Sequence, residues 1–283
     1  MNRRTVLRTG LLCVGGLAAG CTENDPARDE FAKLEAQLPG RLGVFALDTG
    51  SQATVGYKSD ERFLMCSTSK ALSVAATLQQ GELGRVVHYA QSDVLAWAPV
   101  TSQHADTGMT VDALCDAAIT VSDNTAANLL VRLLGGPPAV TAFARSLGDT
   151  VTRADRMEPD LNVTAPGDLR DTSTPAQMAR DLRALALGDR LQPVARERFI
   201  ALLKANTTGG QAIRAGLPPQ WIVGDKTGSG AQGECNDVAI AWPPGRAPLV
   251  VAVYLAPDDP HLPAEQAHRV MARVASVAVS ALT

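Results

Sequence analysis

Segments with strand character lie at the two ends of this 283-residue chain, and the long middle has helical patterns. The N-terminal end consists of a helix at 30–38 and strands at 41–48 and 53–58. The C-terminal end consists of strand candidates at 221–226, 237–242 and 249–255 and a helix at 264–280. The helical middle consists of residues 71–80, 111–119, 125–134, 139–147, 175–187 and 193–205. We therefore predict an α+β fold in which both chain ends form one antiparallel sheet, flanked by helices, with an all-α insertion.

The length suits one large domain or two closely packed smaller ones. We expect an α/β domain from residues 22–60 and 206–283, and an all-α domain from residues 61–205. The net charge is only −3 and 46% of the residues are apolar, so neither a disordered chain nor a nucleic-acid partner is expected. We expect a monomer.

The first 21 residues have the features of an export signal. Arg3, Arg4 and Arg8 form a basic start, and an apolar run at 11–20 is too short to span a bilayer. Leu-Ala-Ala-Gly-Cys at 17–21 resembles a bacterial lipobox, which predicts a lipid on Cys21; a secretory signal with a chance cysteine is the alternative. The arginine pair also suggests twin-arginine export, and the general secretory route stays open beside it. The mature protein is expected outside the cytoplasm, anchored to the membrane.

Cysteine and histidine usage argues against a disulfide framework and a metal site. Three cysteines remain in the mature chain, Cys66, Cys115 and Cys235, an odd number that cannot all pair. A bridge between Cys66 and Cys235 stays open, because sequence gives no distance. The four histidines lack the close pairings of a metal site, so we expect no metal and no cofactor.

One connection is far longer than the usual median of about five residues. It lies between the helices ending near Leu147 and starting near Pro175, and its prolines and glycine prevent regular structure. Arg156 and Asp171 carry opposite charges and would close residues 156–171 into a compact omega loop. A chance surface pair is the alternative.

Three short patterns occur in order: Ser67-Thr68-Ser69-Lys70, Ser122-Asp123-Asn124 and Lys226-Thr227-Gly228. Ser67 falls where an apolar helix begins, so its N–H and the helix dipole would face a developing oxyanion. Lys70 lies one helical turn on, where an amine takes or shares the proton of the hydroxyl. This placement predicts a serine nucleophile with a lysine beside it.

The other two patterns supply partners for that nucleophile. Ser122 would relay a proton to a departing nitrogen, Asn124 would offer an amide to the substrate, and Asp123 would cap or brace the turn. Lys226 would supply a cation, and Thr227 and Ser229 hydroxyl donors. The N–H of Ser229 would complete an oxyanion hole if its strand lies beside Ser67.

These patterns resemble those of class A serine β-lactamases, which share them with penicillin-binding proteins. Residues 117–130, 171–175 and 206–209 are also similar to that family almost residue for residue, and the match covers essentially the whole mature chain. The chain looks like an actinobacterial-type lipoprotein member. The resemblance implies hydrolysis of penicillins and cephalosporins through an acyl-enzyme on Ser67, and hence antibiotic resistance.

The resemblance also implies roles for residues of the long loop and the site mouth. Glu158-Pro159-Asp160-Leu161-Asn162 is similar to a family signature in which Glu158 and Asn162 hold the hydrolytic water. Arg156 and Asp171 match a loop-closing salt bridge, Trp97 matches an aromatic gatekeeper, and Gly228 belongs with the substrate-binding strand.

Glu158 is the residue that separates the family from its rivals. A D,D-peptidase or a non-hydrolytic β-lactam sensor also acylates its serine but lacks such a base for deacylation. Whether Lys70 or Glu158 activates Ser67 for acylation stays open.

The sequence departs from the family at one place. Class A enzymes usually place an arginine behind the Lys-Thr-Gly strand, where it binds the substrate carboxylate and promotes inactivation by clavulanate, but the matching positions here are Cys235 and Ala212. We therefore expect carboxylate binding weaker by about 1 to 3 kcal/mol and slow inactivation by clavulanate. Arg214, His268 and Arg269 are the nearest possible substitutes.

Overall fold

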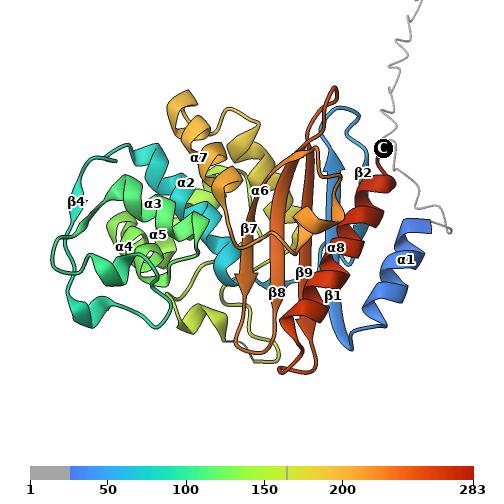
Figure 1. Ribbon diagram of the computed structural model, residues 1–283, viewed down its shortest axis with the longest axis horizontal. Coiled ribbons are helices and arrows are strands. Elements are labelled where there is room, and N and C mark those ends of the chain that lie inside the picture. The colour runs from blue at the N-terminus through green and yellow to red at the C-terminus, as the bar shows by residue number, and fades with distance from the viewer. Residues whose placement is uncertain (1–25, 164) are drawn as a thin grey trace, which may run out of the picture.

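The computed structural model describes residues 26–163 and 165–283, and its centre is one five-stranded antiparallel sheet (Figure 1). The strand order is β2-β1-β9-β8-β7. The strands are β1 (Gly40–Asp48), β2 (Thr54–Tyr57), β7 (Ile222–Ser229), β8 (Cys235–Trp242) and β9 (Leu249–Pro257). The N-terminal β1 pairs with the C-terminal β9 from Gly40↔Pro257 to Asp48↔Leu249. Both chain ends therefore build the sheet, which confirms the predicted fold class.

Helices cover both faces of this sheet. The first and last helices, α1 (Pro26–Glu35) and α8 (Ala264–Ser280), lie on one face, and α6 (Pro175–Ala186) packs against β1, β8 and β9 on the other (Figure 1). Side chains of β1 alternate between the two sides: Val44 joins the core under α1 and α8, and Phe45 joins the core on the helical side. This period of two is the pattern of a strand buried on both faces.

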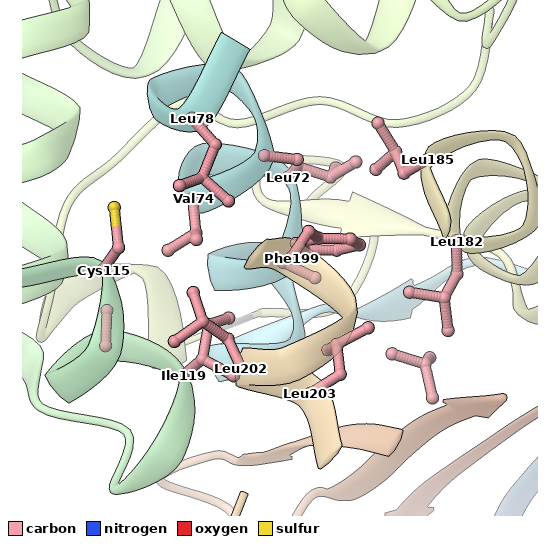
Figure 2. Packing of buried hydrophobic residues seen from close by; sticks show 14 of the residues in the cluster. Leu72, Val74, Leu78, Cys115, Ile119, Leu182, Leu185, Phe199, Leu202 and Leu203 are labelled. Carbon is pink, nitrogen blue, oxygen red and sulfur yellow. The ribbon is translucent and has the colours of Figure 1, made fainter. Parts of the chain in front are cut away.

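The helical part of the chain lies beyond the β7 edge. It contains α2 (Lys70–Gln80), α3 (Val111–Thr120), α4 (Asn124–Leu134), α5 (Pro137–Ser146) and α7 (Pro193–Ala205). Figure 2 shows its core, where α2, α3, α6 and α7 contribute interleaved side chains. The labelled residues are Leu72, Val74, Leu78, Cys115, Ile119, Leu182, Leu185, Phe199, Leu202 and Leu203. Because this core surrounds α2, it fixes the helix that carries the serine and lysine pattern.

Several short elements connect these parts. Two-residue strands pair as β3 (Phe63–Leu64) with β6 (Thr172–Ser173), and as β4 (Val86–Val87) with β5 (Met109–Thr110). The 3-10 helices are η1 (Cys66–Ser69), η2 (Gln91–Asp93), η3 (Thr101–Gln103), η4 (Asp160–Asn162) and η5 (Ile213–Gly216). No sequence pattern predicted these pieces, because two-residue ladders are too short to show a period.

Some predicted boundaries were wrong. The first helix spans Pro26–Glu35 rather than 30–38. The chain turns after Glu35, so Leu38 is buried in the core without being part of the helix. The strand predicted at 221–226 continues to Ser229, because its last residues pair with the start of β8 at Ser229↔Cys235. The helices predicted at 193–205 and 264–280 have the predicted bounds.

The question of a disulfide is answered for the described residues: Cys66, Cys115 and Cys235 are all free and buried. The Sγ atom of Cys235 contacts Sδ of Met271 on α8 at 3.3 Å, on the side of the sheet opposite to α6.

The predicted domain boundaries at residues 60 and 206 stay predictions. The export signal and Cys21 lie outside the described residues. Within them, no helix is both long and apolar enough to cross a bilayer.

Candidate active site

Ser67 lies in η1, which runs directly into α2. Cys66 turns the chain into this helix with a φ of 48°, and the side chain of Ser67 is 8% exposed. Two hydroxyls fix the turn, since Thr68 donates to the carbonyl of Met65 at 2.7 Å and Ser69 to that of Cys66 at 2.8 Å. The N–H of Ser67 is thus held at the start of a helical segment, as the sequence predicted.

The edge strand β7 passes directly beside this turn. A Cβ at Gly228 would lie 2.9 Å from the carbonyl oxygen of Met65 and 3.1 Å from the nitrogen of Ser67. Asn236, the partner of Gly228 on β8, also donates to the carbonyls of Leu64 and Met65. The condition for an oxyanion hole between Ser67 and Ser229, that the strand lies beside the serine, is therefore met.

Lys70 lies one turn after Ser67, and its side chain is only 2% exposed. Its Nζ atom donates to Oδ1 of Asn124 at 2.6 Å and to the carbonyl and Oγ of Ser122 at 2.9 and 3.2 Å, and lies 3.1 Å from Oε1 of Glu158. Burial lowers the pKa of Lys70, and the neighbouring Glu158 carboxylate opposes that shift. A buried amine of lowered pKa is suited to exchanging protons with a hydroxyl.

Glu158 reaches the same point from the long loop. Its Oε1 accepts a hydrogen bond from Oγ of Ser67 at 3.2 Å, and its other oxygen accepts from the amide of Asn162. Asn128 on α4 holds the backbone of Glu158 on both sides, donating to its carbonyl at 2.8 Å and accepting from its N–H at 2.9 Å. The carboxylate is therefore positioned by two amides and lies within hydrogen-bond reach of both Ser67 and Lys70.

Arg156 and Asp171 meet at the neck of the loop, as expected. Nε of Arg156 lies 2.6 Å from Oδ2 of Asp171, and Oδ1 of Asp171 accepts from the N–H groups of Asp155 and Arg156. The two side chains are 18% and 3% exposed. Because this pair is largely desolvated and Asp171 also accepts from two backbone N–H groups, it is not the chance surface pair of the alternative interpretation.

The Ser-Asp-Asn pattern lies in the turn before α4. Ser122 has a φ of 58°, a conformation that directs its hydroxyl toward two ammonium groups, Lys70 at 3.2 Å and Lys226 at 3.1 Å. Asp123 caps α4 by accepting from the N–H of Ala126 and braces the facing loop through Thr101. The structural role predicted for Asp123 is confirmed.

Lys226 on β7 is completely buried. Burial and the positive charge of Lys70 lower the pKa of Lys226 to about 7. Two carboxyl groups lie near Lys226: Asp225 on the same strand and Asp237 on β8. Burial raises the pKa of both carboxyl groups. Arg214 of η5 is bonded to Asp225. Lys226 therefore lies close to two acidic side chains that are completely buried.

An open cleft of about 430 Å³ lies in front of Ser67. Trp97 stands at its mouth, 57% exposed, with Nε1 bonded to the carbonyl of Val121. The predicted residues Ser67, Ser122, Asn124, Asn162, Thr227, Gly228 and Ser229 all line the cleft. The hydroxyls of Thr227 and Thr208 are hydrogen-bonded to each other. The sequence analysis did not single out Thr208.

The structure also adds Asn128 to the predicted set. Asn128 is buried and follows Asn124 by four residues, so the two amides lie on the same face of α4. An amide between apolar residues, here Ala127 and Leu129, is the signal that could have identified it, because a buried amide needs a polar partner.

A serine at a helix start, a buried lysine one turn on and a carboxylate within reach of both define a serine hydrolase that works through an acyl-enzyme. Comparison with known proteins makes the class specific. The Beta-lactamase enzyme family matches residues 26–282. Beta-lactamase AST-1 of Nocardia asteroides is 48% identical over 99% of this chain and 96% of its own length. CTX-M-25 of Escherichia coli is 45% identical over 98% of each chain.

Solved structures agree with these relatives. A class A β-lactamase from Mycobacterium abscessus has a TM-score of 0.87 and 51% sequence identity, over 90% of this chain and 99% of its own. The reconstructed class A enzyme of the last common ancestor of Gram-negative bacteria has the same TM-score and 52% identity, over 90% of this chain and 99% of its own. This chain belongs to the class A serine β-lactamases.

Proposed function

We propose that this protein hydrolyses the amide bond of penicillins and cephalosporins through an ester on Ser67, and so confers resistance to them. The observation that carries the proposal is the position of Glu158, whose Oε1 is 3.2 Å from Oγ of Ser67 and 3.1 Å from Nζ of Lys70. A carboxylate at that point can hold and deprotonate a water molecule that attacks the ester.

Acylation begins when Oγ of Ser67 attacks the lactam carbonyl carbon. The serine proton passes to Lys70 or Glu158, both of which are within reach of the site. The N–H groups of Ser67 and Ser229 stabilise the oxyanion. Collapse of the tetrahedral intermediate breaks the C–N bond, and the nitrogen takes a proton from Ser122. Lys70 or Lys226 then returns a proton to the Ser122 oxygen.

Deacylation takes place in the same site, with water as the nucleophile. Glu158 takes a proton from water as the water oxygen bonds to the ester carbon, and the C–Oγ bond breaks. The proton then returns from Glu158 to Ser67. Asn162 and Asn128 act as positioning residues here, because they hold the carboxylate and the backbone of Glu158.

Two alternatives share the first half of this mechanism: a D,D-peptidase and a sensor that stays acylated. The experiment that separates them follows hydrolysis of a chromogenic cephalosporin by purified residues 22–283. We expect many turnovers per active site, and less than about a hundredth of that rate in Ser67→Ala. A single burst of product equal to the enzyme concentration would instead mean that the serine stays acylated, as in a D,D-peptidase or a sensor.

The proposal includes location. Arg3, Arg4, Arg8 and the lipobox-like ending at Cys21 support export and a lipid anchor, and a diacylated cysteine buries enough CH₂ groups for stable attachment to a membrane. Cys21→Ala should release or leave unprocessed a protein that otherwise sediments with membranes. Unmodified wild-type protein found wholly in the medium would contradict the anchor. The catalytic part is proposed to act as a monomer, which light scattering would test.

A further inference from the structure

We propose that one end of the molecule docks on the anionic headgroups of a phospholipid bilayer and so orients the cleft away from the membrane. The proposed contact, the α6–α7 surface, consists of residues 180–197: the second half of α6, the loop after it and the start of α7. The arginines of this surface, none of which is buried, are Arg180, Arg183, Arg190 and Arg196. The inference rests in part on the location proposed above, because a lipid on Cys21 would place a membrane beside the chain.

The charges of this surface are not neutralised by ion pairs. Most arginines of the described chain pair with a carboxylate, such as Arg41 with Glu61 and Arg132 with Asp93. Among residues 26–163 and 165–283, the arginines outside any ion pair are the four of the α6–α7 surface, Arg28 and Arg62.

The acids of the surface are fewer than its arginines. Asp189 and Glu197 are exposed and form no ion pair within the described ranges, and Asp181 is buried. Since the whole chain has a net charge of −3, this local excess of positive charge is an exception. It favours an anionic partner.

Val194 adds exposed apolar area between Arg190 and Arg196. It is 75% exposed, more than any other large apolar residue of the described chain. Phosphates of lipid headgroups pair with guanidinium groups, and an exposed aliphatic side chain enters the layer between headgroups and acyl chains. A nucleic acid backbone offers no such apolar layer, so a lipid surface is the partner that fits both kinds of side chain.

The α6–α7 surface lies at the end of the sheet where β1 ends. At the start of α6, Pro175 lies against Gly43, and further along the helix Arg180 lies over the ring of Phe45, 5.4 Å from its centre. The helix therefore follows β1 toward Asp48, the last residue of that strand. In Figure 1 this end of the sheet is at the top, where the carboxyl terminus also lies.

The start of α1 lies toward the same end. Glu35, at the end of α1, accepts from the N–H of Leu42 near the beginning of β1, so Pro26 at the other end of the helix lies toward the finish of β1 (Figure 1). Cys21 lies outside the described residues, but the five residue steps from it to Pro26 span at most about 18 Å. A lipid on Cys21 would therefore keep this end of the molecule close to the headgroups.

The cleft lies toward the opposite end of the sheet. Across the paired strands, Val223 of β7 is in line with Asp48 of β1, and from there β7 runs to Gly228, which lies against the backbone of Ser67. At about 3.3 Å per residue, this stretch of β7 is roughly 17 Å long. A membrane on the α6–α7 surface thus leaves the cleft open to substrates dissolved in water.

The test measures sedimentation of residues 22–283 with vesicles of phosphatidylcholine alone or of equal parts phosphatidylcholine and phosphatidylglycerol. This part contains the whole fold, since the Mycobacterium abscessus enzyme matches 90% of this chain over 99% of its own length. Because it carries no lipid, its binding reports on the surface and not on the anchor. We expect binding only to the vesicles with phosphatidylglycerol, and weaker binding as salt is added, because salt screens the charges.

Removing the arginines should abolish most of this binding. A basic side chain at an anionic surface contributes a factor of about five, so Arg183→Gln/Arg190→Gln/Arg196→Gln should lower the partition coefficient about 100-fold. Arg196 also donates to the carbonyl of Gly188 at 2.6 Å. The double variant Arg183→Gln/Arg190→Gln keeps that bond and should lose about 25-fold. Unchanged kcat in solution shows that the variants are folded.

The matched control is Arg41→Gln/Arg132→Gln, which removes the same charge from exposed, ion-paired arginines away from the α6–α7 surface. It should bind as the wild type does. The proposal is overturned if the control loses as much binding as the double variant, if the double variant binds like the wild type, or if both kinds of vesicle bind equally. Equally tight binding of a DNA duplex that the double variant loses would overturn it in favour of a nucleic-acid surface.

The orientation is tested on the full chain in membranes, with a fluorescent label on one introduced cysteine; the three described native cysteines are buried. A label at Gln192→Cys, in the α6–α7 loop, should be quenched by nitroxide-labelled headgroups, and one at Ala231→Cys, in the turn after β7, should not. The reverse pattern would overturn the proposal. Full chain found in the medium would contradict the anchor alone, because vesicle binding by residues 22–283 does not depend on it, so the two failures are distinguishable.

Discussion

The hydroxyl of Ser67 donates to Oε1 of Glu158 at 3.2 Å, across 91 residues of sequence. The serine stands on the first turn before α2, and the glutamate on a loop whose ends are joined by Arg156 and Asp171. Their meeting depends on two independent supports, the core around α2 and the closure of the loop. Catalysis by this protein should therefore be sensitive to changes that leave both residues intact.

The loop neck gives the first such prediction. Arg156→Ala leaves Asp171 buried without its cation, and breaking a buried pair in this way costs about 3 to 5 kcal/mol. We expect a lower free energy of unfolding and a deacylation rate reduced more than the acylation rate, because Glu158 loses its position. Urea denaturation and single-turnover kinetics measure the two effects. Arg85→Ala, which breaks an exposed pair with Glu82, should cost less than about 1 kcal/mol. Equal effects in both variants would contradict a closing role for Arg156.

The contact between β7 and the serine turn gives the second prediction. A methyl group at Gly228 must push the strand away from the backbone of Met65 and Ser67. Since a shift of about 1 Å at a reacting group can cost about 10²-fold in rate, we expect Gly228→Ala to lower kcat/KM by about 10- to 100-fold. Gly84→Ala, where nothing lies within 4 Å of the added Cβ, should behave as wild type. Unchanged kcat/KM in Gly228→Ala would show that the oxyanion hole does not need this close approach.

A buried acid pair far from the cleft gives a prediction on stability. Asp181 on α6 is 2% exposed, and burial together with the charge of Asp149 raises its pKa to about 8. Each carboxyl has one oxygen without a hydrogen-bond partner. Between about pH 4 and pH 8 the folded protein therefore keeps a proton that the unfolded chain releases, so stability falls as pH rises through this window and levels off above it.

Asp181→Asn removes this titration. Its melting temperature should exceed that of the wild type by more than about 4 °C at pH 8.5, and the difference should shrink toward pH 5. The exposed Asp189→Asn serves as the control and should follow the wild-type curve. Parallel melting curves for Asp181→Asn and the wild type at all pH values would mean that the pair is not protonated in the folded state.

How much of this could be predicted differs between the fold and the site. The joined chain ends, the helical insertion and the positions of Ser67, Lys70 and Glu158 were accessible because each leaves a local pattern: a period, a spacing or a short motif. The pairs Asp149 with Asp181 and Arg214 with Asp225 were not accessible. They join residues from different elements, and no spacing relates them before the chain folds.

The same distinction applies to the missing arginine. The sequence identified Ala212 and Cys235 as the positions without a guanidinium and named three substitutes, but it gave no way to choose among them. Only the packing of α8 against the sheet brings His268 to the cleft while Arg214 turns to Asp225. A choice among side chains on different elements needs three-dimensional contacts.

Ala212 and Cys235 therefore offer a fourth prediction. Both line the cleft wall beside His268. Ala212→Arg and Cys235→Arg should raise kcat/KM for benzylpenicillin and the rate of inactivation by clavulanate, since each adds a bidentate donor for a carboxylate. If neither variant gains, the cleft already binds the carboxylate fully.

The role of Glu158 is the central claim, and intact-protein mass spectrometry of Glu158→Ala mixed with benzylpenicillin tests it most directly. We predict a mass increase equal to that of the antibiotic, located on Ser67 by peptide mapping and stable for hours, while the wild type shows no lasting adduct. Ser67→Ala should show no adduct under the same conditions. An adduct on Glu158→Ala that disappears at the wild-type rate, with normal turnover, would contradict the claim that Glu158 drives deacylation.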